Sequence, residues 1–535
     1  MKYNSLSYPY HSMRAVTYGK HGMVATSQQL AAQAGLDILK QGGNAIDAAI
    51  ATAACLTVVE PVSNGIGGDC FALVWHKDKL HGLNSSGPVP KSISINAVKK
   101  MGHEVMPTFG FIPVTIPGAP AGWVELSKRF GNLSLKETLK PAIEYAQNGY
   151  PVPPMVSSAW QRAAKAYKKH LTESQFESWS NTFTINGHAP KPGELWSSTG
   201  HARTLQKIAD TNARTFYDGV IADRIDAYSK ECGGFLSKED LKAFKPEWVE
   251  PISANYRGYD VWEIPPNGQG LIALMALNIL KEFDFDCKDC ADTLHKQIEA
   301  IKLAFVDGKK YITDNKKMQV GVDDLLSQQY AKIRKSLIRE DAILPLPGQP
   351  PKGGTVYLAT ADDQGNMVSF IQSNYMGFGS GMVVPDTGIS LQNRGHSFSL
   401  DPKHHNCLSP GKRTYHTIIP GFITKDNKAV GPFGVMGGFM QPQGHVQVIM
   451  NLIDFNLNPQ SALDAPRWQW MEDKKVLVEH DIPIHIVREL IAKGHEITYN
   501  SGYGTFGHGQ IIIRDKNGVL AGGTEPRTNG AVVAW

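Results

Sequence analysis

A threonine stands directly behind two glycines in the second half of the chain, at Gly353-Gly354-Thr355. A threonine hydroxyl is a weak nucleophile and needs an adjacent base. If the bond before Thr355 is cut, this residue gains an α-amine, and the reference pKa of such an amine, about 7.7–8.0, suits a base. Read only locally, Thr355 also fits an ordinary β-branched strand residue. Its role therefore depends on its surroundings.

The segments on either side of Thr355 differ in pattern. Residues 339–354 are rich in proline and glycine, which predicts an exposed, extended linker. The segments 355–362 and 365–375 are rich in β-branched and aromatic residues, and a Gly-Asn pair separates them. This pattern predicts a hairpin. The threonine would thus begin a strand at the end of a flexible linker.

The rest of the chain supplies elements that could hold such a strand. Apolar residues recur at helical spacing before Gly42-Gly43-Asn44, which ends one helix and caps a second, almost wholly apolar helix over 45–59. We expect a hairpin at 71–84, mainly helices over 120–240 and a helix at 295–312. Later strand signals lie at 416–423, 429–435 and 510–515, with helices at 441–453 and 484–494. This order favours stacked sheets covered by helices.

Three apparent cofactor or metal motifs fail on context. The G-x-G-x-x-G at 502–507 precedes a strand pattern, whereas a dinucleotide site needs a helix there. Cys287 and Cys290 form one pair, whereas a structural zinc site needs four ligands. His404 and His405 lie in a polar loop. The sequence therefore predicts neither a cofactor nor a metal.

Composition narrows the class of protein. The 535 residues include 54 basic and 50 acidic side chains, a net charge of +4, which gives no argument for a nucleic-acid partner. No run of about 18 apolar residues predicts a membrane span. The N-terminus lacks the apolar core of a secretory signal, and six cysteines are too few for a disulfide framework. We expect a cytoplasmic protein.

Many segments, in the right order, resemble those of the γ-glutamyltransferase (glutathione hydrolase) proenzymes, which are N-terminal-nucleophile hydrolases. They include VVEPVSNGIGGDCFALVW and EAIKLAFVDG in the first half, and GFGSG, TGISLQN, PGKR, GPFGVMGG, LDAPRW and EPRTNG in the second. The resemblance implies an α+β fold, the four-layer αββα sandwich. It also implies self-cleavage of one precursor into a large subunit, 1–354, and a small subunit, 355–535, which stay intertwined.

The resemblance also implies roles for individual residues. Thr355 falls on the nucleophile that begins the small subunit, and Ser373 falls on a second hydroxyl that supports it. Gly437 and Gly438 fall on the diglycine whose amides form the oxyanion hole, where glycine permits close approach. His416-Thr417 falls where classical members have a Ser-Ser pair near the substrate.

The expected substrate-binding residues depart from the family. Classical members hold the γ-glutamyl carboxylate with an arginine, but residues 83–90 contain none. They hold the α-amine with an aspartate, but that position is Ser397. Arg394, in the same stretch as Ser397, is a candidate replacement for the missing arginine. The alternative is that Arg394 faces solvent or pairs with a surface acid.

The first functional hypothesis is therefore a γ-glutamyl hydrolase or transferase that acts on glutathione-like amides, with water or an amine as acceptor. The second is an acylase or amidohydrolase of the same fold that takes a glutaryl, oxamic or related short dicarboxylic amide. The third is an inactive member that only binds a ligand, which the presence of Thr355, Ser373 and the diglycine argues against. The oligomeric state is open, with a homodimer among the options.

Overall fold

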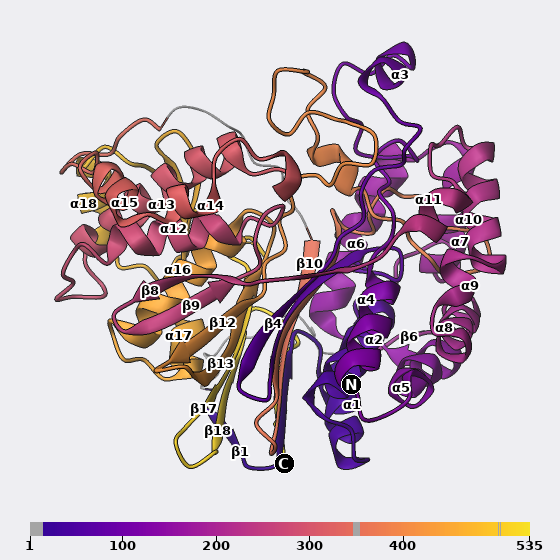
Figure 1. Cartoon of the computed structure of the whole chain (residues 1–535), viewed down its shortest axis with the longest axis horizontal. Helices are drawn as coiled ribbons and strands as arrows, with labels where there is room; N and C mark the ends of the chain where they lie inside the picture. The colour runs from indigo at the N-terminus through magenta and orange to yellow at the C-terminus, as the bar shows by residue number, and fades with distance from the viewer. Residues whose placement is uncertain (1–13, 346–353, 501, 503) are drawn as a thin grey trace.

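The computed structural model describes residues 14–345, 354–500, 502 and 504–535. Two seven-stranded sheets lie face to face in the middle of the molecule, and helices cover the outer face of each (Figure 1). The predicted α+β fold, a four-layer αββα sandwich, is confirmed.

The strand that begins the second half of the chain lies near the centre of the first sheet. Its order is β19 (Ala531–Ala534), β2 (Gly22–Thr26), β10 (Gly354–Asp362), β11 (Met367–Tyr375), β3 (Asp69–His76), β4 (Lys79–Ser85) and β7 (Glu247–Val249). The predicted hairpins are β3–β4 and β10–β11. Strands from before and after Thr355 thus pair with one another in one sheet.

The second sheet also contains strands from both halves, with those from after Thr355 in its middle. Its order is β1 (Thr17–Gly19), β18 (Leu520–Thr524), β17 (His508–Arg514), β13 (Lys428–Met436), β12 (Gly421–Lys425), β9 (Tyr259–Glu263) and β8 (Ile252–Tyr256). Phe71, Tyr357 and Ile371 of the first sheet pack against Phe422 and Ile512 of the second. Because both faces of the central strands are covered, every residue of β11 is buried and no polar alternation is visible.

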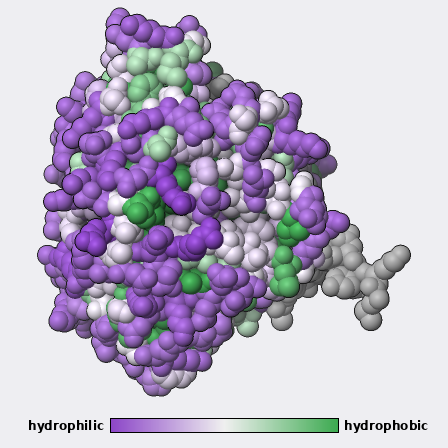
Figure 2. Space-filling model, turned by 90° about the vertical axis from the view of Figure 1, so that its right-hand side faces the viewer, coloured by the Kyte–Doolittle hydropathy of each residue, from purple (hydrophilic) through white to green (hydrophobic). Residues whose placement is uncertain are grey.

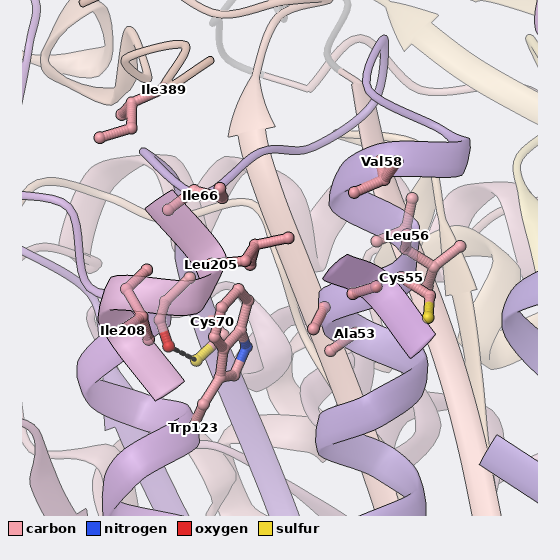
Figure 3. Close-up of a cluster of buried hydrophobic side chains, with 14 of the residues drawn as sticks. Ala53, Cys55, Leu56, Val58, Ile66, Cys70, Trp123, Leu205, Ile208 and Ile389 are labelled. Carbon is pink, nitrogen blue, oxygen red and sulfur yellow. Dashed lines mark hydrogen bonds between the residues drawn. The ribbon is translucent and has the colours of Figure 1, made fainter. Parts of the chain in front are cut away.

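The helices over the first sheet centre on α2 (Ala45–Val59), whose residues are all buried. Asn44 and Asp47 form a capping box that fixes its start. Figure 3 shows α2 side chains in the same cluster as Trp123 and Cys70, whose thiol points at the Ala119 carbonyl. The other helices of this half are α1 (Gln29–Lys40), α3 (Ile95–Lys100), α4 (Ala119–Phe130), α5 (Leu135–Asn148), α6 (Pro154–His170), α7 (Glu177–Phe183), α8 (Thr199–Thr211), α9 (Arg214–Tyr217), α10 (Val220–Glu231) and α11 (Lys238–Ala243).

The helices over the second sheet include two that are almost wholly buried, α12 (Gly270–Leu280) and α16 (Met440–Ile453). They pack with α13 (Ala291–Tyr311) into one apolar cluster. The remaining elements are α14 (Val322–Leu326), α15 (Gln328–Lys335), α17 (Pro459–Asp464), α18 (Ile484–Ala492), three short 3₁₀ turns, the small sheet β14 (Trp468–Glu472), β15 (Lys475–Val478) and β16 (Glu496–Tyr499), and the pair β5 (Tyr150–Pro151) and β6 (Leu195–Trp196).

Two local expectations differ from the structure. The predicted strand 416–423 begins only at Gly421, because the His416 backbone bonds to the loop at Asn267 and Gln269, and Pro420 has no N–H to donate. Half of the predicted exposed linker, residues 346–353, lies outside the described residues. Its described beginning is partly buried, since the Ile343 N–H donates to the Glu299 carboxylate.

The face of the molecule shown in Figure 2 is mostly hydrophilic. In Figure 2 the apolar residues of the face toward the viewer form small patches separated by polar ones. Among the described residues, no helix combines the length and the apolar composition needed to cross a bilayer.

Candidate active site

Thr355 lies at the start of β10, with 1% of its surface exposed. Gly354 pairs with Tyr375 and Val356 with Gln372, so the β10–β11 register shifts by one residue at Thr355. Such an irregularity re-aims a side chain. The Thr355 hydroxyl donates to the Ser373 Oγ at 3.3 Å, and the Gln441 amide donates to the Thr355 Oγ1 at 3.5 Å. The structure therefore brings the predicted nucleophile and its predicted supporting hydroxyl together.

Ser373 is the point where several groups of the site meet. Its Oγ accepts from the Tyr375 N–H at 2.8 Å and from the Arg394 guanidinium at 3.3 Å. A positive charge one hydroxyl away from Thr355 favours negative charge on the Thr355 oxygen. Ser373 thus couples the nucleophile to a buried cation.

Arg394 is fully buried, so the alternative that it faces solvent or a surface acid is wrong. It donates to Thr417 Oγ1 at 2.7 Å, and its guanidinium lies 4.2 Å from the centre of the Tyr375 ring. Burial lowers the pKa of Arg394 to about 10, which still leaves it charged at neutral pH. In the described part of the chain no carboxylate forms a salt bridge with it, and its Nε has no hydrogen-bond partner. An unpaired buried cation of this kind is suited to an anionic ligand.

Asp69 is a residue of this site that the sequence analysis did not identify. It lies directly opposite Ser373 in the β3–β11 pair, so both side chains project from the same face of the sheet. Its carboxylate accepts from Gln392 at 2.8 Å, from the Gly87 N–H at 3.0 Å and from His416. Burial raises the pKa of Asp69 to about 7, and nearby Arg394 opposes that rise.

His416 is held as a neutral group. Its Nε2 lies 3.1 Å from Asp69 Oδ2, and its Nδ1 accepts the Ile418 N–H at 3.3 Å, so the ring hydrogen is on Nε2. Burial lowers the pKa of His416 well below its usual value. Because both ring nitrogens are engaged, His416 orients Asp69 rather than acting as a base. Its neighbour Thr417 binds Arg394, as described above.

Gly437 and Gly438 form the turn between β13 and α16. Their φ angles are +136° and +62°, a region that favours glycine. A Cβ on Gly437 would lie 3.0 Å from the Gly507 Cα, so the position has no room for a side chain. Gln441, in the first turn of α16, brings this turn next to Thr355. A developing oxyanion here would lie at a helix N-terminus, whose dipole favours negative charge.

The remaining predicted substrate residues lie at the edge of this cluster. Ser397 ends the short 3₁₀ turn that begins at Arg394, and its hydroxyl lies near the Tyr375 phenol without a hydrogen bond of normal geometry. Residues 83–90 reach the site through Gly87, which donates to Asp69. Arg413 approaches this stretch and donates to the Ser86 carbonyl, but its charge is paired with Glu247.

Three residues that could hold a metal lie together elsewhere. His295 and Glu299 on α13 and His495 before β16 place their ligand atoms within 4.8 Å of one another. The Lys302 ammonium lies 2.6 Å from the Glu299 carboxylate and supplies a positive charge there. His295 Nε2 is already bonded to the Arg339 carbonyl. The cluster thus holds the segment after α15 in place.

Comparisons with known proteins agree with this geometry. The family described as Gamma-glutamyltranspeptidase matches residues 31–535. The chain is 37% identical to the glutathione hydrolase-like YwrD proenzyme of Bacillus subtilis, over 97% of this chain and 100% of that protein. It is 33% identical to the oxamate amidohydrolase proenzyme of Klebsiella pneumoniae, over 98% of this chain and 100% of that protein.

Among solved structures, the cephalosporin acylase from Bacillus halodurans is 62% identical and superposes with a TM-score of 0.98, over 100% of this chain and 99% of that one. The γ-glutamyltranspeptidase of Helicobacter pylori is 28% identical, with a TM-score of 0.56 over 61% of this chain and 94% of that one. The chain belongs to the γ-glutamyltranspeptidase family and is an N-terminal-nucleophile amidohydrolase.

Proposed function

We propose that the chain cuts itself before Thr355 and then hydrolyses or transfers a short acyl group that carries a carboxylate. The observation that carries this proposal is the fully buried Arg394, one hydroxyl away from Thr355 and without a carboxylate partner among the described residues. Leaving such a charge buried and unpaired costs free energy, and an anionic acyl group would offset that cost.

The chemistry follows from the groups around Thr355. The freed α-amine takes the hydroxyl proton as Oγ1 attacks the amide carbon, and the amides of Gly437 and Gly438 stabilise the oxyanion. The C–N bond breaks, the leaving amine takes the proton from the α-ammonium, and an ester on Thr355 remains. Water, or an acceptor amine, then attacks the ester in the same way and restores the free hydroxyl.

γ-Glutamyl amides are the first class of donor. Their α-carboxylate matches the guanidinium of Arg394, which replaces the arginine absent from residues 83–90. The relatives in the family with this chemistry include the glutathione hydrolase proenzyme of Escherichia coli, 30% identical over 97% of this chain. This supports glutathione-like donors.

A second class of donor is favoured by one feature, the neutral Ser397 at the position where an α-ammonium would be bound. A glutaryl amide is a γ-glutamyl amide without that ammonium, so it needs the cation but no acidic partner. The similarity to a protein named cephalosporin acylase supports this alternative.

The first experiment concerns the cut itself. Purified protein should run as two fragments, and N-terminal sequencing of the smaller should read Thr-Val-Tyr, the sequence at Thr355. An active preparation that contains only the uncut chain would refute the proposed nucleophile.

The second experiment compares matched donors with one leaving group. γ-Glutamyl, glutaryl and butyryl p-nitroanilides differ only in the α-amino and carboxylate groups. We expect both carboxylate-bearing donors to exceed the butyryl compound in kcat/KM, and the ratio of the first two assigns the donor class. Equal rates for all three would show that no carboxylate is recognised.

A further inference from the structure

A second feature of the molecule adjoins the catalytic turn but is separate from the Arg394 cluster. A cavity of about 410 Å³ borders Gly437 and its neighbours Met436 and Phe439. None of the four predicted substrate-binding residues Arg394, Ser397, His416 and Thr417 lines it. The turn at Gly437 therefore borders a cavity that the buried Arg394 cluster does not line.

One face of α6 forms a wall of this cavity. Met155, Val156, Ala159, Arg162 and Ala163 line it at the spacing of a helical stripe. Because α6 precedes Thr355 in the chain and Gly437 follows it, the cavity is built from both halves. The other apolar wall residues are Val62 and Met471.

Few of the titratable side chains that line this cavity carry a charge without a partner. Glu60 lies at the end of α2, 8% exposed, and its carboxylate accepts a hydrogen bond from the Ser27 hydroxyl at 2.5 Å. Arg527 is ion-paired with Glu479 and Glu525. Burial holds the pKa of His508 down at about 4, so that ring is neutral, and Arg162 is exposed at the mouth.

An amide that reacts at Thr355 extends in two directions from its carbonyl carbon. If the carboxylate of the acyl group binds Arg394, the amine half points away from that cluster. The cavity beside Gly437 is the space available on that side, and its volume and apolar walls are those of a small-molecule site.

We propose that this cavity is the subsite for the leaving or accepting amine, and that it takes a bulky, largely apolar amine whose polar group contacts Glu60. This inference rests on the proposed function, because it presumes that the acyl group occupies the Arg394 side. It assigns the size preference of the enzyme to α6 and its charge preference to the end of α2.

The test fills the cavity and varies the leaving group. Ala159→Trp places a large ring in the cavity, and Ala166→Trp is the matched control, because Ala166 is exposed on the same helix. γ-Glutamyl aminomethylcoumarin has a bulky leaving group, whereas glutamine releases ammonia. We expect Ala159→Trp to lower kcat/KM for the bulky donor roughly tenfold or more, with glutamine within about twofold of wild type.

Equal losses for both donors would place the acyl group in the cavity and overturn the inference. No change for either donor would show that the cavity does not take part in the reaction, and would also overturn the inference. Fluorescence titration with free aminomethylcoumarin gives a readout that needs no turnover. Wild type and Ala166→Trp should bind it and Ala159→Trp should not, even if γ-glutamyl is the wrong acyl group, whereas absence of binding to wild type would also overturn the inference.

A second variant tests the contact with Glu60. At a pH well above 7, where Glu60 is an anion, wild type should prefer a p-(aminomethyl)anilide over a p-carboxyanilide of the same acyl group. Glu60→Gln should remove most of that preference, and Glu144→Gln, an exposed control on α5, should keep it. A preference unchanged in Glu60→Gln would remove this residue from the subsite.

Discussion

Buried arginines occupy two regions of this molecule, and their charges are balanced differently. Arg467 and Arg527 surround Glu525, at 3.0 Å and 2.5 Å, and Arg527 also pairs with Glu479. Arg394 is as deeply buried as Arg467, yet in the described residues its contacts are two hydroxyls and an aromatic ring.

The difference separates a structural role from a binding role. In the Arg467–Arg527 region the charges satisfy one another, and the carboxylate pKa of Glu525 is lowered to about 2 by both arginines despite its burial. In the Arg394 region burial also lowers the pKa of the cation, and nearby Asp69 opposes this only in part, because no carboxylate of the described residues forms a salt bridge with Arg394. The first region should stabilise the fold, and the second should bind a ligand.

The largest expected effect is on catalysis, at Thr355. Thr355→Ala removes both the nucleophile and the expected cleavage, so activity should fall on the order of 10⁴-fold or more, and the chain should stay uncut. Thr355→Ser keeps the hydroxyl and should retain part of both. Gel electrophoresis and steady-state kinetics measure the two effects, and substantial activity in Thr355→Ala would contradict the assignment.

The next effect concerns Arg394. Arg394→Ala should lower kcat/KM for a carboxylate-bearing donor by roughly 10²–10³-fold, the cost of breaking a buried charge contact, and should affect a butyryl donor far less. The free energy of unfolding should not fall in the way a broken ion pair requires, since there is no pair to break. Equal losses on both donors would show that Arg394 does not recognise the carboxylate of the substrate. The contrast between the Arg394 region and the Arg467–Arg527 region would then no longer hold.

Glu525 should show the opposite behaviour. Glu525→Gln leaves Arg467 without its carboxylate partner, and breaking such a buried pair costs about 3–5 kcal/mol of stability. Denaturant unfolding measures this loss. The kcat of the folded variant should remain close to wild type. A large catalytic defect without destabilisation would contradict the structural role assigned to Glu525.

The pH dependence sharpens the same prediction. The pKa of Glu525 is lowered to about 2 in the folded protein, from about 4.3 in an unfolded chain, so its contribution is present above the unfolded value. That contribution, roughly 3 kcal/mol, is lost as pH falls through this window. Glu525→Gln should flatten the acid limb of the stability profile, whereas Arg394→Ala should leave it unchanged.

The smallest effect is expected at Ser373, which links Arg394 to the nucleophile. Ser373→Ala removes one supporting hydrogen bond, worth about 0.5–1.5 kcal/mol, so turnover should fall by roughly tenfold or less. Ser373→Thr keeps the hydroxyl and serves as the control. A loss as large as that of Thr355→Ala would make Ser373 part of the reaction itself.

The sequence predicted many of the helices and strands around Thr355, because the signals that define them are local. The Gly42-Gly43-Asn44 boundary, the apolar helix 45–59 and both hairpins depend on capping, turn and periodicity signals within a few residues. The start of β12 at Gly421 was less predictable, since the preceding loop bonds to a segment more than a hundred residues earlier.

The residues of the site could be predicted from the sequence only in part, because contacts between distant segments bring some of them together. Resemblance pointed to Thr355, Ser373 and the diglycine, and the structure brings these together. Asp69 was missed because its relevance comes from the cross-strand register with Ser373, a pairing that no single segment encodes. The burial of Arg394 likewise depends on Tyr375, at the end of β11, and on Thr417, in the loop before β12.

Each sheet contains strands from both before and after Thr355, and this has a consequence for how the enzyme folds and unfolds. The chain folds while it is continuous, with the order of its strands fixed by one backbone. If the chain is cut before Thr355, as proposed, a denatured molecule is two separate polypeptides that must associate again, and neither contains all the strands of either sheet. Heat inactivation of the cut enzyme should therefore be governed by the rate of unfolding, and recovery should depend on protein concentration.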